Sequence, residues 1–528
     1  MIRFVPAWYN TDRAWYSSDG AWFRAASGRE TDDTVTQLRV FHQGEEPTEL
    51  VVLNYAPSLR RFLHAQDVFD VPYWSFFDEI QGLADDYAQP IDFLMLDWPE
   101  DVSFYYNPFL VTVMRETEVY ARVYLAKDGT LQSIRYFGDG MPTLERIFDD
   151  RGFPSSVLMH DEDGRPMTQY YLSRGGDVIV SEDVPSGRID IVQNPGGRFA
   201  HGSYASWPEL IAEFLAAHLA ATRGAQDTVV LAVSPQHDGL VASVLGGETL
   251  VLSRSASRPS EVSSAVLQRA GAVFSDVGAA SAEGAEGAEP AAAEAWAYLP
   301  ELSVYPLERR ATFGASANEA TVYISLFVDD ITAEQLDYAI AMAAGQLVGD
   351  ERTRLLVCTF RSHDLDYLNQ VRRVIGGYQH LDLAFLAGDD IAGLGVDIGI
   401  AEGPEEKIQL VLLDREDELT RTIAKSRVLI DLGATVSYRL ATEAVNAGVP
   451  QIARYEHELV THPINGYVIA DESDLPAALD HFLSGLEHWN QSLVQCRVLQ
   501  DLFRPQEVLD RWALVKEGAA YAGPADRA

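Results

Sequence analysis

One stretch constrains the fold more than any other: an apolar run at residues 428–432 leads into a helical pattern that ends at Gly448. The run reads Val-Leu-Ile-Asp-Leu, which predicts a buried strand. Glycine is typical of a helix end because it adopts positive φ without a Cβ clash. Pro450 then prevents the helix from continuing, and an extended segment is expected from Ile452. The stretch predicts a strand, a helix and a second strand in that order.

The same stretch resembles the donor half of a two-domain, GT-B type glycosyltransferase, in which a helix ending in E-A-x-x-x-G-x-P frames the nucleotide-sugar cleft. In active retaining members a second glutamate lies eight residues before the first, and this chain has a threonine there. An N-G-aromatic turn also follows the helix, as in those enzymes. The resemblance implies a sugar-transferase fold without catalytic residues. The candidates for a vestigial donor cleft are Thr435, Glu443, Gly448, Pro450, Asn465 and Gly466.

Glu443 has two interpretations. Its carboxylate could accept hydrogen bonds from the ribose of a nucleotide sugar, or it could pair with Arg439 one turn earlier, at about 0.3 kcal/mol. A working transferase also needs cations or donors around the diphosphate leaving group. The basic residues near the motif in sequence are sparse (Lys425, Arg427 and Arg439), which counts against catalysis.

The charge balance argues against several classes of partner. The chain has 528 residues, of which 79 are acidic and 40 basic, so its formal net charge is −39. Such a charge argues against nucleic-acid binding and against unaided docking on anionic lipid, and it makes a diphosphate site harder to build. The length alone predicts two or three domains.

No metal or cofactor site is expected. Cys358 and Cys496 lie far apart and form neither a disulfide framework nor a zinc spacing, and Cys358 lies in an apolar run typical of a core strand. His457-Glu458 and His462 approach a zinc motif, but histidines five residues apart on a helix point about 140° away from each other. The Gly393-Leu394-Gly395 run is an incomplete dinucleotide loop. Without a signal-peptide core or a long apolar stretch, we expect a cytoplasmic protein.

Strand and helix patterns alternate along most of the chain, and from about residue 206 they follow a βαβ rhythm that implies a parallel sheet. Residues 276–294 are dominated by Ala, Gly, Glu and Ser, which predicts a flexible loop. The expected strands are 1–5, 50–53, 92–96, 228–233, 249–252, 408–413 and 428–432. The expected helices are 34–41, 71–80, 207–221, one that ends at 245, and several within 474–519.

Residues 103–195 differ from the rest because apolar and polar residues alternate between turns at 127–130 and 161–164. This pattern predicts an antiparallel meander, and its aromatic content suggests a packed face and a face for solvent or a partner. We expect an exposed strand edge around 119–137 that would permit strand addition by an extended segment. The aromatic candidates for partner binding in this segment are Tyr120, Tyr124 and Tyr136.

Three tryptophans near the start, Trp8, Trp15 and Trp22, are seven residues apart. The spacing suggests a helical stripe, but Asp19-Gly20 interrupts any continuous helix. Core packing is the favoured interpretation because a tryptophan buries a large apolar area. The alternative is a binding surface, with Tyr9, for a glycosylated or serine-rich chain.

His237-Asp238, in a loop between a predicted strand and a predicted helix, also has two interpretations. The pair could act as an acid and base. N-capping of the helix by Asp238 explains it equally well.

The opening of the chain carries a more specific resemblance. The run Phe4–Asn10, the pair Trp15-Tyr16 and the run Asp32–Arg39 are similar to the start of the first accessory Sec system protein family of Gram-positive bacteria. The resemblance covers the whole chain and is strongest at 1–40 and 428–470. It implies an α/β, GT-B-like fold in which two Rossmann-like parallel-sheet domains carry an antiparallel β-rich insertion in the first.

The implied function is that of a non-catalytic component of the accessory Sec system, which exports serine-rich-repeat glycoprotein adhesins. The protein would be a scaffold or chaperone that binds the second and third accessory Sec proteins, the dedicated SecA-type motor and the adhesin. It would reach the inner face of the cell membrane at most peripherally, through partners. Two alternatives remain: an active retaining glycosyltransferase that uses a nucleotide sugar on serine-rich acceptors, and a regulatory partner of such an enzyme.

The expected domains follow from this layout. Residues 1–102 and 206–312 form a discontinuous Rossmann-like domain, and 103–205 form the β-sheet insertion. Residues 313–505 form the second Rossmann-like domain, and 506–528 a C-terminal helix and tail.

Overall fold

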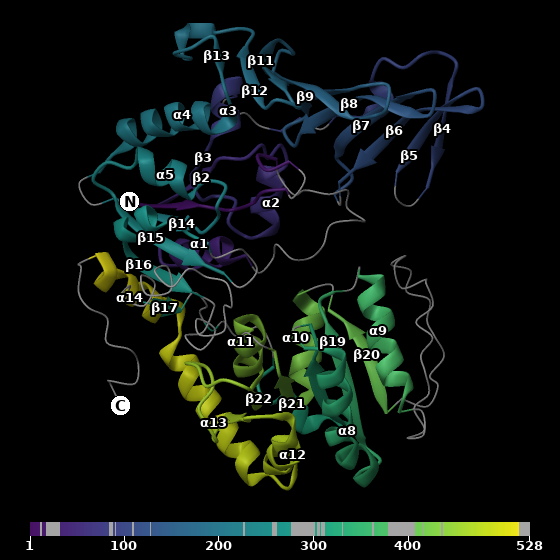
Figure 1. The fold of residues 1–528 in the computed structure, drawn as a ribbon, viewed down its shortest axis with the longest axis vertical. Helices are drawn as coiled ribbons and strands as arrows, with labels where there is room; N and C mark the ends of the chain where they lie inside the picture. Colours follow the sequence, from purple (N-terminus) through teal and green to yellow (C-terminus); the bar gives the residue numbers. More distant parts are fainter. Residues whose placement is uncertain are drawn as a thin grey trace. The chain divides into compact units, whose positions relative to one another are not determined.

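The computed structural model describes most of the chain (Figure 1). The residues it describes are 1–10, 13–16, 32–83, 88–89, 91–107, 110–126, 128–224, 227–255, 261–275, 301–303, 307, 312–329, 331–361, 364–378, 407–413, 416–433 and 437–516. Thr435, Trp22, the glycine run at 393–395 and the segment 276–294 lie outside these residues. The chain divides into two compact units, the first comprising Met1–Ala26, Gln37–Ser253 and Pro259–Val273 and the second the remainder.

A seven-stranded sheet, in the order β17-β16-β15-β14-β1-β2-β3, organises the first α/β region. Its central pairs, from β15 through β14, β1 and β2 to β3, are parallel. The strands are β1 (Ile2–Val5), β2 (Thr48–Val52), β3 (Tyr73–Ser75), β14 (Thr228–Ala232), β15 (Thr249–Arg254), β16 (Ala270–Ser275) and β17 (Glu301–Ser303). The helices are α1 (Asp33–Gln43), α2 (Leu59–Ala65), α3 (Phe76–Gln81), α4 (Trp207–Thr222), α5 (Asp238–Val244) and α6 (Ser264–Arg269).

A ten-stranded antiparallel sheet is inserted between β3 and β14, in the order β13-β12-β11-β10-β9-β8-β7-β6-β5-β4. The predicted turn at 161–164 is confirmed, because Gly164 has a φ of +77° and Asp161 accepts from the backbone N–H of Asp163. The strands are β4 (Val102–Tyr106), β5 (Val111–Arg115), β6 (Glu118–Leu125), β7 (Leu131–Gly138), β8 (Met141–Asp149), β9 (Phe153–His160), β10 (Pro166–Leu172), β11 (Val178–Asp183), β12 (Arg188–Ile191) and β13 (Ser203–Tyr204).

An ion-pair network joins this sheet to the helices of the first α/β region. The guanidinium of Arg60, on α2, contacts Asp78 on α3 at 2.9 Å and Asp149 at the end of β8 at 3.1 Å. Arg151, in the turn after β8, contacts the same two carboxylates. The network fixes the insertion to the parallel sheet that carries it.

The second unit contains a six-stranded sheet in the order β20-β19-β18-β21-β22-β23, and every neighbouring pair is parallel. The strands are β18 (Val322–Phe327), β19 (Thr353–Thr359), β20 (Ile408–Leu412), β21 (Ser426–Asp431), β22 (Gln451–Ala453) and β23 (Gly466–Val468). The helices are α8 (Ala333–Gly349), α9 (Leu365–Gly376), α10 (Glu416–Lys425), α11 (Tyr438–Ala447), α12 (Leu475–Leu483), α13 (Glu487–Leu502) and α14 (Pro505–Lys516).

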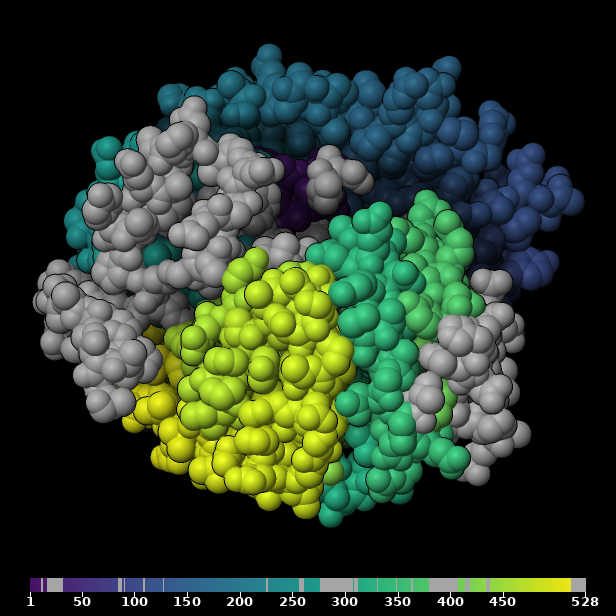
Figure 2. All heavy atoms as spheres, turned by 60° about the horizontal axis from the view of Figure 1, so that its bottom comes forward, coloured from purple at the N-terminus to yellow at the C-terminus, as the bar shows by residue number. Residues whose placement is uncertain are grey.

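The strands of this sheet send alternate side chains into two hydrophobic cores, as period-two geometry requires. Ile324 and Leu355 join the core under α8, α9 and α12, and Leu356 and Leu429 join the core under α10 and α11. In the space-filling view of Figure 2, α12 (yellow) and α8 (green) form a continuous surface, in agreement with their contacts. In sequence order the strands run 3-2-1-4-5-6, so the order reverses between β18 and β21. Ligands of such sheets bind outside the carboxyl ends of the strands at this switch point.

Three sequence expectations about strands, helices and sheet edges are wrong. Residues 92–96 form a 3-10 helix, η2 (Phe93–Met95), because the carboxylate of Asp92 accepts from the backbone N–H of Leu94 and caps a turn. The predicted helix 71–80 begins as strand β3, and α3 starts only after Ser75 caps it. The segment 119–137 is not a sheet edge, since β6 pairs with β5 and β7, and β7 pairs with β6 and β8.

Candidate functional site

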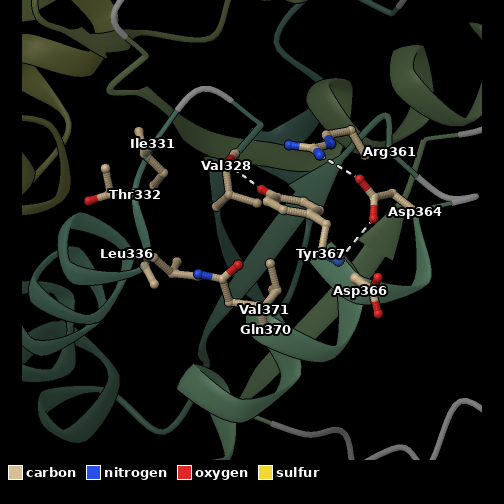
Figure 3. Close-up of a pocket in the computed structure, with 11 residues that line it drawn as sticks. Val328, Ile331, Thr332, Leu336, Arg361, Asp364, Asp366, Tyr367, Gln370 and Val371 are labelled. Atoms are coloured by element: carbon tan, nitrogen blue, oxygen red, sulfur yellow. Dashed lines mark hydrogen bonds and ion pairs between the residues drawn. The ribbon is translucent and has the colours of Figure 1, made fainter.

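A pocket of about 520 Å³ opens at the carboxyl end of β18, between the first turns of α8 and α9 (Figure 3). Its apolar part comes from Val328, Ile331, Leu336 and Val371. Its polar groups belong to Thr332, Arg361, Asp364, Asp366, Tyr367 and Gln370. None of these residues stood out in the sequence, and the signal that could have found them is the position of two helix starts directly after parallel strands.

The polar groups of the pocket largely bind one another. Asp364 caps α9 by accepting from the backbone N–H of Tyr367 at 3.0 Å, and it pairs with Arg361 at 2.5 Å. The hydroxyl of Tyr367 donates to the carbonyl of Val328, and the Arg361 guanidinium carbon lies 4.0 Å from the centre of the Tyr367 ring. Asp364 balances the charge of Arg361 and Asp366 adds a carboxylate, so the pocket disfavours a diphosphate.

Glu443, the donor-ribose candidate, lies on α11 and is only 7% exposed. Its carboxylate accepts a hydrogen bond of 3.1 Å from the hydroxyl of Thr420 on α10. The carboxylate therefore joins two helices on one face of the sheet, and a buried acceptor with such a partner is costly to reassign to a ligand.

The glycine and the proline of the motif, Gly448 and Pro450, have structural roles. Gly448 ends α11 in the left-handed conformation with a φ of +74°, as the sequence predicts. A Cβ there would lie 2.6 Å from Cδ2 of Leu493 on α13, so the close approach also requires glycine. The carbonyl of Pro450 accepts from the backbone N–H of Leu429 at 3.0 Å and so extends the pairing of β21 with β22.

The Asn465-Gly466 turn enters β23, as predicted. The fully buried Asn465 donates from Nδ2 to the carbonyl of Leu459 and accepts from the backbone N–H of Thr461. A Cβ on Gly466 would lie 2.5 Å from Cγ1 of Val460. Both residues shape the loop before β23.

The basic residues near the motif do not gather at the pocket. Lys425 and Arg427 flank Ser426, where β21 begins, so they lie at the amino ends of the parallel strands. Lys425 lies over the ring of Tyr323, and Arg427 over that of Trp489. Arg439, in the first turn of α11, lies with its guanidinium carbon 4.3 Å from the centre of the Phe360 ring.

In the first unit the strand order reverses between β1 and β14, and the loops after these strands bring Tyr9 and His237 together. The fully buried His237 contacts the carbonyl of Ala232 through Nε2 at 2.8 Å and the hydroxyl of Tyr9 through Nδ1. Since the carbonyl only accepts, Nε2 carries the hydrogen, and in the neutral ring Nδ1 accepts from Tyr9. Both ring nitrogens are thus used within the protein.

The interpretation of Asp238 as the N-cap of α5, one of the two left open by the sequence, is wrong. The N-cap position belongs to His237, and Asp238 is the first residue of the helix. Its carboxylate accepts from the backbone N–H of Ser234 at 3.0 Å and closes the loop after β14.

Trp8 and Trp15 are 6% and 8% exposed, and they do not share a helix. The Trp8 ring packs against Phe62 with centres 4.9 Å apart, and the Trp15 ring packs against Tyr9 at 5.4 Å. The structure therefore leaves little of either indole for a ligand.

Tyr120, Tyr124 and Tyr136 are half-buried on β6 and β7. The rings of Tyr120 and Tyr136 lie 5.8 Å apart, and both lie near Trp98. Tyr124 faces the guanidinium of Arg135 at 5.7 Å. The three tyrosines thus contact neighbouring side chains of the inserted sheet.

Within the described part of the chain, no group of three His, Cys, Asp or Glu side chains is arranged to hold a metal ion. His457 and Glu458 lie in a turn closed by a bridge between His457 and Val460, not on a helix. Both cysteines are buried, and burial raises the pKa of each thiol to about 12. Among the described helices, none has the length and apolar character needed to cross a membrane.

Comparisons with known proteins agree over nearly the whole chain. The family model for the first accessory Sec system protein matches residues 1–518. The first accessory Sec system protein of Streptococcus gordonii is 29% identical over 527 residues, which cover 97% of this chain and 98% of that protein. A chain of the Glycosylation Associate Protein (Gap123) complex from Streptococcus agalactiae is 25% identical with a TM-score of 0.77, covering 98% of this chain and 100% of the other.

The pneumococcal O-GlcNAc transferase GtfA, solved with UDP and GlcNAc, has a TM-score of 0.65 at 12% identity, covering 98% of each chain. At that identity the likeness shows the fold alone. The α/β, GT-B-like fold with two parallel sheets and an antiparallel insertion is therefore confirmed.

Proposed function

The chain belongs to the family of the first accessory Sec system protein, and from this premise we propose that it is a non-catalytic scaffold of that system. It binds the second and third accessory Sec proteins and serves the export of serine-rich-repeat glycoprotein adhesins. Contacts with the SecA-type motor and with the adhesin, and a peripheral position at the membrane through partners, belong to the same proposal. The structural relative from Streptococcus agalactiae was solved as a complex, which supports the assembly.

The observation that carries the non-catalytic part is the engagement of Glu443. A retaining transferase of this fold needs a carboxylate that is available to the donor, and here the carboxylate is buried against Thr420. The pocket at the carboxyl end of β18 adds to the argument, because Arg361 is already paired with Asp364. Neither feature provides the cationic surroundings that a leaving diphosphate requires.

The test is a calorimetric titration of the full chain with UDP-glucose and with UDP-N-acetylglucosamine, repeated with Glu443→Ala. We expect flat titrations for both proteins with both donors. Saturable binding that disappears in Glu443→Ala would instead support an active transferase, and assays on serine-rich acceptor peptides would follow.

Co-purification tests whether the chain binds the partner proteins. The tagged chain, expressed with the second and third accessory Sec proteins, should retain both through gel filtration, and Glu443→Ala should retain them equally. Loss of both partners from the unmodified chain would contradict the scaffold proposal. The domain boundaries expected from the sequence are part of this proposal, and limited proteolysis of the chain tests them.

A further inference from the structure

The two edges of the ten-stranded sheet differ in length and protection. The edge strand β13 has two residues, whereas β4 has five, at the outer end of the sheet in Figure 1. Proteins usually protect a long edge with charges, prolines or a bulge. The sequence of β4, Val-Ser-Phe-Tyr-Tyr, contains no charge and no proline, and its register with β5 is regular from Val102 to Tyr106. The β4 edge is therefore a template for a further strand.

The alternation of an antiparallel pair identifies the outward backbone groups. The backbone N–H of Asn107 donates to the carbonyl of Leu110 at 3.2 Å, so this pair is hydrogen-bonded across the turn. Two residues further along the register, Tyr105 bonds to β5, and so does Ser103. The N–H and C=O groups of Phe104 and Tyr106 consequently face away from β5, and no other strand pairs with β4 in the part of the chain that the structure describes.

Exposed apolar side chains flank this edge. Tyr105 and Tyr106 are 59% and 64% exposed, and on η2 Leu94 and Met95 are 47% and 83% exposed. The ring of Phe93 lies 6.4 Å from that of Tyr106, which places η2 beside one face of β4. A strand added here would gain side-chain contacts as well as main-chain hydrogen bonds.

The charged residues near β4 in the sequence favour one kind of added strand. Six acidic residues fall between positions 92 and 118, against one basic residue, Arg115, which already pairs with Asp101 at 2.7 Å. The six are Asp92, Asp97, Glu100, Asp101, Glu116 and Glu118. An added strand therefore gains from lysine or arginine and loses from aspartate or glutamate.

We propose that the β4 edge binds an extended, neutral or basic segment of the transported polypeptide by strand addition; this rests on the proposed function. The transported chain is favoured over a permanent subunit because five residues of backbone and four exposed side chains form a small contact, below the roughly 1,000 Å² of a stable interface. Strand addition through main-chain hydrogen bonds also tolerates many different side chains, which suits a transported polypeptide of low sequence complexity.

The first experiment is residue-resolved hydrogen exchange on the full chain with a synthetic serine- and threonine-rich peptide that carries lysines. The amides of Phe104 and Tyr106 should gain protection of about tenfold or more on binding, whereas those of Ser103 and Tyr105, already bonded to β5, should not change. A matched peptide with glutamates in place of lysines should give no protection. Binding of the lysine peptide without protection at Phe104 and Tyr106 would overturn the proposal.

The second experiment uses the peptide affinity of variants. Tyr106→Pro removes an outward N–H and no ladder bond, so affinity should fall about tenfold, while Tyr106→Ala, which keeps the N–H, should have a smaller effect. Tyr105→Lys should weaken and Tyr105→Glu strengthen binding of the lysine peptide, which keeps the test valid if the proline variant does not fold. Equal peptide affinity of all variants would refute the proposal that the peptide binds at the β4 edge.

Failure here is separable from failure of the scaffold proposal. If the chain retains the second and third accessory Sec proteins but binds no lysine peptide, the β4 inference falls and the scaffold stands. If the partners are lost as well, the scaffold proposal falls with it.

Discussion

The hydroxyl of Tyr9 donates to Nδ1 of His237, and this hydrogen bond joins the loops that follow β1 and β14 at the point where the strand order of the first sheet reverses. In an enzyme of this class of fold, that point is where polar groups meet a ligand. Here burial raises the pKa of Tyr9 well above its ordinary value, so the phenol stays neutral and donates. At this switch point the polar groups of Tyr9 and His237 therefore bind each other instead of a ligand.

The first prediction concerns this bond. Tyr9→Phe should lower the free energy of unfolding of the first unit by about 1 kcal/mol, because Nδ1 of the buried His237 loses its donor. Chemical denaturation followed by tryptophan fluorescence measures the change. Tyr105→Phe is the matched control, since its hydroxyl is on an exposed side chain and its loss should change nothing measurable. An equal effect of both substitutions would refute the role of the bond.

The second prediction concerns Gly448. Gly448→Ala should destabilise the second unit by about 2–4 kcal/mol, because the residue has a φ of +74° and its Cβ would meet Leu493 at 2.6 Å. Leu493→Ala removes the closest contact and leaves the backbone strain, together with the contact to Cε2 of Phe313 at 3.0 Å. The double variant should therefore lose less stability than the sum of the two single variants, in a double-mutant cycle measured by urea unfolding. Simple additivity would show that the contact with Leu493 does not matter.

Some strand and helix boundaries of the second unit were predictable from the sequence. The apolar run at 428–432 and the glycine at 448 predict β21 and the end of α11 because these signals depend on neighbours in the chain. The environment of Glu443 was not predictable, since its partner Thr420 lies 23 residues away on another helix. The aromatic spacing of Trp8 and Trp15 gave no helix, because packing of Trp8 against the distant Phe62 and of Trp15 against Tyr9 decides their positions.

The insertion shows the same limit. Alternation predicted antiparallel strands, but nothing local distinguishes an internal strand from an edge, because the answer depends on which strands pair. The interpretation of 119–137 as an edge was therefore wrong, and β4 has that place. The prediction of a helix at 71–80 was wrong in its first half because Tyr73 and Trp74 pair with β2, in line with the strand preference of aromatic residues.

The third prediction concerns the ion-pair network between α2 and the insertion. Arg60→Met should destabilise the first unit by about 3–5 kcal/mol at neutral pH, because Asp78, Asp149 and Asp150 lose a shared, largely buried cation. Arg115→Met, which removes an exposed pair with Asp101, should change the stability far less, because solvent screens such a pair. Thermal unfolding of both variants measures the difference.

The pH dependence of Arg60→Met gives a further check on the same network. Burial raises the pKa of Asp78, and the charge of Arg60 opposes that rise. Removing Arg60 therefore raises the pKa of Asp78 in the folded state still further. The loss of unfolding free energy in the variant, relative to the unmodified protein, should shrink as the pH falls and the carboxyl becomes protonated. A deficit that stays constant from neutral to acidic pH would contradict this explanation.

The fourth prediction concerns acid sensitivity of the second unit. Burial lowers the pKa of His457 from 6.5 to about 4, and Nδ1 of its ring accepts from the backbone N–H of Leu459 at 3.3 Å. Between these two pH values the unfolded chain binds a proton that the folded chain does not, so stability falls as the pH decreases through this window, by up to about 3 kcal/mol. His457→Gln keeps a side chain that can accept and does not titrate, and it should flatten the pH profile of unfolding between pH 6.5 and 4. If His457→Gln keeps the full slope, other groups cause the acid sensitivity, and the buried imidazole is not what couples the second unit to pH.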